Sequence, residues 1–367
     1  MATRRVAVRS TPMNFFPVAA RWLGVARLSA ALGASAGPVV EFKLPAPPPP
    51  DETPVVAPAV EPTAETAVPD SVLEVPAQAN VGRPVTSWLE AQIELARRGF
   101  SSGAIDGVGG AQSAAALRAY QEKENLAPSG VLDAPTRETL LMLAEPLTTL
   151  TLSAADCARL QPLSDTWLGK STQSALDYET ALELLAERAH ASPNLLKRLN
   201  PAIDWSGPIL PGTVVKVPAV GRVNVSGVAA RLHVKLAERV LQVRDAEDRL
   251  LAHFPVSIAR KVEKRPVGEL HVTVAIANPD YTFDPAVFPE SEEAQQLGRK
   301  LILPPGPNNP VGLAWIGLDR PGYGIHGTPK PEQVGRTESH GCFRLANWDA
   351  QTLRPLVWVG LTVVVDP

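Results

Sequence analysis

The chain has 367 residues, enough for two or three domains, and its 37 prolines are well above the roughly 5% of average usage. The formal net charge is −3 and no basic stripe stands out, so composition gives no reason to expect a nucleic-acid partner. No run of about 18 apolar residues occurs, so we expect no transmembrane span. Two cysteines are too few for a disulfide framework, and a chain this long can build a core without one.

The first segment, residues 1–36, has features of a signal peptide. It begins with several arginines and ends in the small residues 34–36, which resemble a cleavage site. Arg21 and Arg27, however, interrupt the apolar stretch that an export signal needs. We therefore expect a cleaved signal peptide here, with a disordered tail as the alternative.

Residues 37–84 are rich in proline, with scattered alanine, valine and glutamate, and include four consecutive prolines at 47–50. Proline fixes the backbone angle φ and removes the amide donor, so such a stretch forms an extended, semi-rigid chain without a core. We expect a linker.

The segment 85–145 shows helical periodicity and contains two similar turns, 103–107 and 130–133. Each turn places an aspartate before a helical run, where its carboxylate can accept unpaired backbone amides. We expect helices over 111–123 and 134–143. The segment resembles the three-helix peptidoglycan-binding domain family, which implies binding to the bacterial wall. The matching residues are Gln92, Arg98, Gly99, Phe100, Ile105, Asp106, Gly107, Ala116, Leu117, Arg118, Ala119, Tyr120, Gln121, Leu126, Gly130, Val131, Leu132, Asp133 and Thr136.

The segment 165–218 combines a helix-like run over 178–190 with a short alternating strand over 214–218. Its Leu-Asn-Pro and Pro-Gly-Thr sequences, at 199–201 and 211–213, resemble those of a LysM module, a glycan-binding α/β fold. The alternative is a plain connector domain.

The last segment, 223–367, changes to short stretches in which apolar and polar residues alternate, as in half-buried strands. Turns rich in proline and glycine separate them. Asn347 is expected to cap a helix over 348–355. We therefore predict a mostly β domain with one or two helices. The expected strands are 232–236, 240–243, 270–276 and 361–365.

Residues with chemical potential concentrate in this last segment. Cys342 follows His326 by 16 positions and lies two positions after His340. A thiol with an ordinary pKa of about 8.5 needs a nearby imidazole to become a nucleophile at neutral pH. The glycines at 327 and 341 would let the backbone approach a substrate and adopt positive φ. The pattern therefore predicts a cysteine nucleophile with an oxyanion site formed by adjacent amides.

Two other interpretations of these residues stay open. His326, His340 and Cys342 could together bind a catalytic zinc ion, although the spacing is unlike that of familiar zinc sites. Each residue alone could also be a buried structural group. Cys157 lies in a helix-like stretch and is interpreted in that second way.

The segment resembles the catalytic domain of the L,D-transpeptidase family, also called YkuD. The resemblance covers nearly all of 223–367. The main matching residues are His326, Gly327, Thr328, Gly335, Ser339, His340, Gly341, Cys342, Phe343 and Arg344. Supporting matches lie at 266–268, 305–312 and 347–349 and at Tyr281. Phe343 departs from the family, where an aliphatic residue is commoner.

The resemblance implies a role for each residue of the motif. Cys342 would attack the carbonyl after the third residue of a peptidoglycan stem peptide and expel the terminal D-alanine. His326 would be the general base, with His340 and Ser339 orienting the loop. Arg344 would hold a substrate carboxylate. An amine would then resolve the thioester, and no cofactor or metal is needed.

The sequence thus predicts a multidomain α+β protein with a three-helix wall-binding domain, a LysM-like α/β segment and a mostly β catalytic domain of β-sandwich type. Its expected partners are peptidoglycan stem peptides and glycan strands. The expected location is the periplasm or envelope of a bacterium. The acceptor could be a second stem or a lipoprotein lysine. The alternatives are water, as in an L,D-carboxypeptidase or lipoprotein-releasing amidase, and a non-catalytic wall-binding protein.

Overall fold

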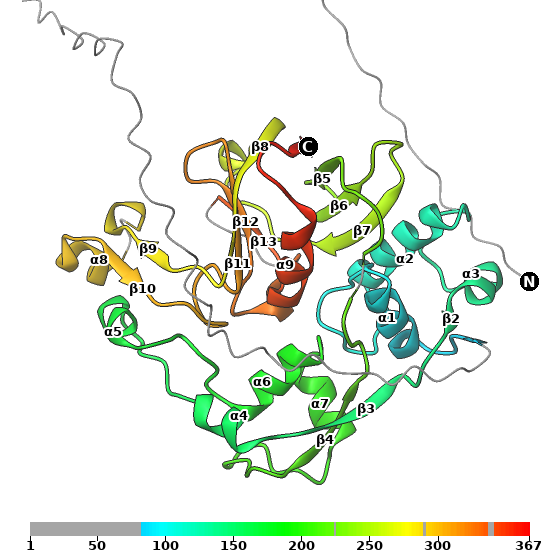
Figure 1. Cartoon of the computed structure of the whole chain (residues 1–367), viewed down its shortest axis with the longest axis horizontal. Coiled ribbons are helices and arrows are strands. Elements are labelled where there is room, and N and C mark those ends of the chain that lie inside the picture. The colour runs from blue at the N-terminus through cyan, green and yellow to red at the C-terminus, as the bar shows by residue number, and fades with distance from the viewer. Residues whose placement is uncertain (1–81, 224, 289–290, 337–340) are drawn as a thin grey trace, which may run out of the picture. The chain divides into compact units, whose positions relative to one another are not determined.

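The computed structural model describes residues 82–223, 225–288, 291–336 and 341–367 (Figure 1). The predicted signal peptide at 1–36 and most of the predicted linker lie outside these ranges. In the described part of the chain, no helix has both the length and the apolar content that a membrane span requires.

The first described region contains three helices and a two-stranded sheet: β1 (Arg83–Pro84), α1 (Trp88–Arg97), α2 (Ala111–Lys123), α3 (Ala134–Thr139) and β2 (Leu141–Met142). The two similar turns each have a buried glutamine as their partner. The side-chain oxygen of Gln92 accepts hydrogen bonds from the amides of Asp106 and Gly107, and that of Gln121 accepts one from Gly130. These bonds satisfy backbone amides inside the turns, which fixes how the helices follow one another.

Of the two aspartates that were predicted to cap a helix, one does so and the other does not. Asp133 caps α3 by accepting from the amide of Thr136. Asp106, in contrast, accepts from Val108 within its own turn, and α2 begins after Gly110 without a side-chain cap. Four residues, 107–110, separate Asp106 from α2, whereas Asp133 directly precedes α3, so Asp106 lies too far from the first turn of its helix to cap it.

The next region pairs β3 (Leu147–Thr151) with β4 (Val214–Pro218) in an antiparallel ladder. Between them lie α4 (Ala154–Arg159), α5 (Trp167–Thr172), α6 (Ala181–Arg188) and α7 (Pro193–Leu199). The strand β3 therefore lies before the predicted LysM-like segment 165–218, although it pairs with β4 inside that segment. Leucines of α6 and α7 and valines of β4 share one buried core, so two helices pack on a two-stranded ladder.

The rest of the chain forms an eight-stranded mixed sheet in the order β13-β12-β11-β8-β14-β5-β6-β7, which confirms the predicted mostly β domain (Figure 1). Its strands are β5 (Arg231–Lys235), β6 (Val240–Arg244), β7 (Leu250–Pro255), β8 (Gly268–Ala277), β11 (Ala314–Leu318), β12 (Gly324–His326), β13 (Phe343–Arg344) and β14 (Thr362–Asp366). The remaining elements are β9 (Tyr281–Phe283), α8 (Glu292–Leu297), β10 (Leu301–Leu303), α9 (Asn347–Leu353) and the 3₁₀ turns η1 (Val262–Lys264), η2 (Pro285–Val287), η3 (Pro331–Gln333) and η4 (Arg354–Leu356).

The long strand β8 changes partner along its length. Residues 268–271 pair with β14, whereas residues 272–277 pair with β11. Beyond the end of β7, Ser257 forms an antiparallel bridge with Arg344 of β13. The two ends of the sheet are therefore joined, and a sheet that curls in this way encloses one apolar core made by both of its halves.

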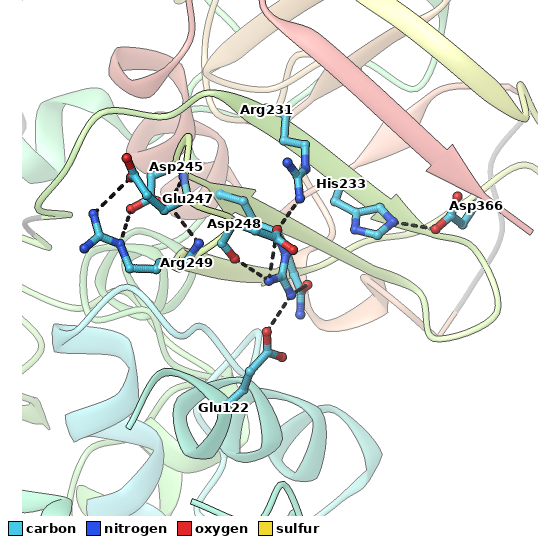
Figure 2. Close-up of polar contacts among 10 residues, drawn as sticks. Glu122, Arg231, His233, Asp245, Glu247, Asp248, Arg249 and Asp366 are labelled. Carbon is cyan, nitrogen blue, oxygen red and sulfur yellow. Dashed lines mark hydrogen bonds and ion pairs between the residues drawn. The ribbon is translucent and has the colours of Figure 1, made fainter. Parts of the chain in front are cut away.

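The helical regions are tied to this sheet by specific contacts. The backbone of residues 99–101 adds to the outer edge of β7, with Phe100 bridged to His253. Glu122 of α2 pairs with Arg244 of β6 at 2.8 Å, within a cluster of charged residues on the outer face of the sheet (Figure 2). Ser101 donates a hydrogen bond of 3.0 Å to the buried carboxyl of Asp349 on α9.

Burial raises the pKa of Asp349 to about 8, a rise that the hydrogen bond from Ser101 reduces only in part. The folded protein therefore keeps this carboxyl protonated at neutral pH, whereas the unfolded chain ionises it near pH 4. The stability contributed by the neutral carboxyl is fully present below about pH 4 and is lost as the pH rises through 8.

We predict that replacing Asp349 by asparagine, which keeps the acceptor for Ser101, removes this pH dependence. Between pH 5 and pH 8, the free energy of unfolding of the wild type should fall by at least about 1 kcal/mol more than that of Asp349→Asn. Urea unfolding at both pH values measures the difference. Equal changes in the two proteins would contradict a buried neutral carboxyl.

Candidate active site

The site is built on the parallel pairing of β12 with β13. In this pairing Ile325 lies beside Phe343, and His326 lies beside Arg344. Ile325 and Phe343 are both buried in the core of the sheet. Because side chains alternate along a strand, His326 and Arg344 project from the opposite face. Cys342 lies two residues before Arg344, in the bend that leads into β13. Cys342 therefore lies next to the ladder, at the end where both strands begin.

The thiol of Cys342 lies against the turn that precedes β12. It donates to the carbonyl of Gly322 at 3.5 Å. Burial raises the pKa of the thiol, while a hydrogen bond from the backbone of Gly324 and the positive charge of Arg344 act in the opposite direction. The resting thiol is therefore protonated at neutral pH and needs a base at the moment of attack.

His326 has the properties of such a base. Its side chain is buried, and its Nδ1 lies 2.7 Å from the carbonyl of Gly327. A carbonyl only accepts, so Nδ1 carries the proton and Nε2 of the neutral ring presents its lone pair. Burial lowers the pKa of His326 to about 4, and the positive charge of Arg344 adds to this effect. The imidazole is thus neutral and able to take a proton throughout the physiological range.

Two aromatic residues form walls beside this pair. Trp315 of β11 lies opposite His326 in the ladder and stacks on its ring with 5.6 Å between ring centroids. A side chain at Gly324 would run into the Trp315 ring, since an added Cβ would come within 2.5 Å of it. Tyr281 of β9 has a pKa that is raised by burial and, to a smaller extent, by the charge of the neighbouring Cys342 thiolate.

Trp315 was not predicted from the sequence. A signal for it exists, because Ala314 and Ile316 on either side are buried in the core and alternation turns the tryptophan to the other face. The alternation alone does not say that this face carries the site, which is why the residue was missed.

Behind His326, the fully buried Asn347 connects several segments. Its Oδ1 accepts from the amide of Leu313 at 3.2 Å, and its Nδ2 donates to both carboxylate oxygens of Glu187 at 3.0 and 3.2 Å. An added Cβ on Gly327 would come within 2.2 Å of the Asn347 oxygen. The glycine after His326 is thus needed for this close approach.

Two expectations from the sequence need correction here. Asn347 is not the cap of its helix but its first residue, and Ala346 holds the cap position without a side-chain bond. Its side-chain amide instead forms hydrogen bonds with Leu313 and Glu187. Gly327 does not adopt positive φ. Glycine is needed at this position because there is no room for a side chain. Glu187 was not predicted, since its partner lies 160 positions away in sequence.

The remaining predicted residues are placed as follows. Thr328 is buried, and its hydroxyl accepts from the amide of Lys330 at 3.4 Å. Gly341 lies directly before Cys342 and, contrary to the expectation from the sequence, does not adopt positive φ. Ser339 and His340 lie outside the described residues, so their predicted roles stay predictions. So does the zinc interpretation, which includes His340.

Comparisons with known proteins give matches for the catalytic segment and for the helical segment that precedes it. Residues 229–365 match the family described as "L,D-transpeptidase catalytic domain", and residues 85–140 match "Putative peptidoglycan binding domain". The "Putative L,D-transpeptidase in ATP synthase subunits region ORF 5" of Fuscovulum blasticum is 30% identical over 161 residues, which cover 40% of this chain and 82% of that protein. The chain belongs to the L,D-transpeptidase family.

Other relatives agree with this assignment. The "Putative L,D-transpeptidase YkuD" of Bacillus licheniformis is 26% identical over 51% of this chain and 93% of its own length. A solved L,D-transpeptidase from Xylanimonas cellulosilytica is 13% identical, covers 79% of this chain and 98% of its own, and has a TM-score of 0.32. A TM-score this low supports no conclusion, so membership of the family depends on the sequence matches. No comparison showed the LysM-like resemblance.

We predict that Asn347→Ala destabilises the protein by about 2 kcal/mol, because it removes two hydrogen bonds from the buried Glu187 carboxylate and one from the amide of Leu313. Gln351→Ala, an exposed change on the same helix, should cost less than about 0.5 kcal/mol. Urea unfolding compares the two variants. Equal stability would show that Asn347 does not hold these segments together.

Proposed function

We propose that this L,D-transpeptidase family enzyme cleaves the bond before the terminal D-alanine of a peptidoglycan stem through a thioester on Cys342. The observation that supports the proposal is the register of β12 and β13, in which His326 lies beside Arg344 and Cys342 directly precedes β13. The family matches supply the substrate class. A nucleophile, a base and a cation at this ladder suit attack on the carbonyl of a substrate that also carries carboxylates.

The protons can be followed through both half-reactions. Nε2 of His326 takes the proton of the Cys342 thiol as sulfur attacks the carbonyl after the third stem residue. Backbone amides next to Cys342 bind the developing oxyanion. The imidazolium then gives its proton to the departing nitrogen of D-alanine, which leaves a thioester. An acceptor amine attacks the thioester, loses a proton to His326 and regenerates the thiol.

Arg344 has a defined part in this scheme. Its guanidinium interacts with the charge on Cys342, and burial lowers its pKa. It therefore stabilises the thiolate while that species exists and offers a positive charge to a substrate carboxylate. His340 and Ser339 would complete the loop around the nucleophile.

The organisation of the chain supports a polymeric substrate. We propose that the wall-binding domain at 85–145 and the LysM-like module at 165–218 hold glycan strands near the catalytic domain at 223–367. Each weak contact would raise the effective concentration of stems at Cys342. The signal peptide and the linker would deliver the enzyme to the cell envelope and space it from its exit point.

The acceptor is proposed to be an amine, either of a second stem, giving a 3-3 cross-link, or of a lipoprotein lysine. Trp315 stacks on His326 and Tyr281 lies near Cys342, and two apolar rings that shield a thioester from water would favour an amine. Hydrolysis, as in an L,D-carboxypeptidase or lipoprotein-releasing amidase, is the second candidate. The presence of both His326 and Cys342 argues against a non-catalytic wall-binding protein.

We predict that purified protein incubated with disaccharide-tetrapeptide forms a covalent adduct on Cys342 and releases D-alanine together with cross-linked dimer. Cys342→Ala should lower turnover by at least about 10³-fold, because no other group replaces the thiolate. Cys157→Ala should keep full activity, since that sulfur lies on α4 against the carbonyl of Ile209. Mass spectrometry of protein and products reads both results.

An adduct at another residue, or full activity of Cys342→Ala, would rule out the proposed nucleophile. Release of D-alanine with tripeptide and no dimer would replace the amine acceptor by water and leave the first half-reaction intact.

The lowered pKa of His326 gives a second prediction, on pH. With a pKa of about 4, the imidazole is still neutral at pH 5.5, so single-turnover acylation there should be within about twofold of the rate at pH 7.5. An ordinary histidine of pKa 6.5 would be about 90% protonated at pH 5.5 and would lower the rate about tenfold. Quenched-flow samples analysed by mass spectrometry distinguish these outcomes, and a tenfold loss would contradict a buried neutral base.

A further inference from the structure

The wall-binding domain touches the loop that leads to the nucleophile. Residues 331–336, which include the turn η3, lie five to eleven positions before Gly341 and Cys342. Gln112, in the first turn of α2, donates a hydrogen bond from its side-chain amide to the backbone carbonyl of Val334. An added Cβ on Gly335 would come within 2.2 Å of the same amide nitrogen, so the side chain of Gln112 lies directly on this loop.

The loop is connected to the strand of the nucleophile through Ser257. The amide of Gly335 donates to the Ser257 hydroxyl at 2.9 Å. The backbone of Ser257 exchanges two hydrogen bonds with Arg344, of 2.9 and 3.0 Å. Since Arg344 is only two residues after Cys342, the position of Val334 and Gly335 is tied to that of the thiol. Ser257 is buried, so this connection is not loosened by solvent.

Arg239 and Ser257 of the catalytic domain also hold this loop, by donating to the carbonyls of Gly335 at 3.2 Å and Gln333 at 3.4 Å. Another contact from the wall-binding domain is weaker. Arg336 lies 3.8 Å from Asp106 but is 62% exposed, and exposed ion pairs contribute little. A cleft of about 210 Å³ opens beside Gln112, between the start of α2 and Gly335, so apolar packing does not fill this side of the loop. Within the described residues, the Gln112 bond is the direct tie from the wall-binding domain to the carbonyls of the loop.

We propose that Gln112 is a positioning residue for the acyl-transfer reaction, through which the docked wall-binding domain holds residues 334–335 and, by way of Ser257, the strand that begins directly after Cys342. The inference rests on the proposed role of Cys342. It gives the wall-binding domain a part in the chemistry beyond attachment, because loss of the contact lets the loop and the thiol move away from His326. A displacement of about 1 Å at a reacting atom is enough to lower a rate severely.

Two variants of Gln112 and one matched control test the proposal in the full-length chain. Gln112→Ala removes the side chain, and Gln112→Glu keeps its shape but replaces the donor by an acceptor that faces another acceptor. Glu122→Ala is the control, because it breaks the contact of 2.8 Å between the other end of α2 and Arg244 without touching the loop. All three should unfold within a few degrees of the wild type.

With disaccharide-tetrapeptide as substrate, both Gln112 variants should lower kcat about tenfold and leave KM within twofold, whereas Glu122→Ala should change neither constant. A rise in KM at unchanged kcat would overturn the proposal, since Gln112 would then only bind substrate. Equal kcat values for the Gln112 and Glu122 variants, or wild-type kcat for Gln112→Glu, would also overturn it.

A second readout does not depend on turnover. Iodoacetamide labelling of Cys342 is followed by mass spectrometry against pH, with Cys157 in the same digest as internal control. A released loop should expose the thiol, so the labelling midpoint of Cys342 should move down toward that of an ordinary thiol in the Gln112 variants alone. Activity in Cys342→Ala would refute the proposed nucleophile, whereas an unchanged Cys342 midpoint in both Gln112 variants would refute the positioning role by itself.

Discussion

The short parallel ladder between β12 and β13 is the constraint on which the site depends. It consists of two residue pairs, and a shift of β13 by one residue would turn Phe343 out of the core and Arg344 into it. The register is held from both sides. Ile325 and Phe343 are buried in the apolar core, and Ser257 pairs with Arg344 at the outer edge. Hydrophobic burial and backbone hydrogen bonds thus set the register of β13, and no charged group of the site is needed to set it.

Buried polar groups provide a second layer of support and come largely from outside the catalytic sheet. Glu187, from the region between β3 and β4, meets Asn347 next to the His326–Gly327 segment, and Ser101 meets Asp349 on the same helix. Burying a carboxyl costs free energy unless the group is neutral or hydrogen-bonded. Asp349 is neutral, and Glu187 is hydrogen-bonded to Asn347. Such pairs add little net stability. Any other packing against α9 would leave their buried polar groups unpaired, so they favour the observed packing of Ser101 and Glu187 against this helix.

Much of this could be predicted from the sequence, and the failures share a cause. The helix at 111–123 and the strand at 214–218 follow from local periodicity. The nucleophile–base pair comes from a motif of adjacent residues and stays a prediction. The role of Asn347 could not be predicted, because its partner Glu187 is 160 positions away and a lone asparagine before a helical run is most simply a cap. The prediction that Asp106 caps a helix was wrong for a local reason, because its turn is separated from the start of α2. Trp315 lies on a face whose importance depends on which strand becomes its neighbour.

The segment 99–101 has a consequence for the protein outside its reaction. β7 is the last strand of the sheet order, and its outer backbone groups would otherwise be open to a strand from another chain. The addition of Phe100 and its neighbours to that edge occupies them. A catalytic domain that lost its helical partner to a protease would therefore present a free edge strand in a crowded envelope. The wall-binding domain thus also protects the enzyme against self-association.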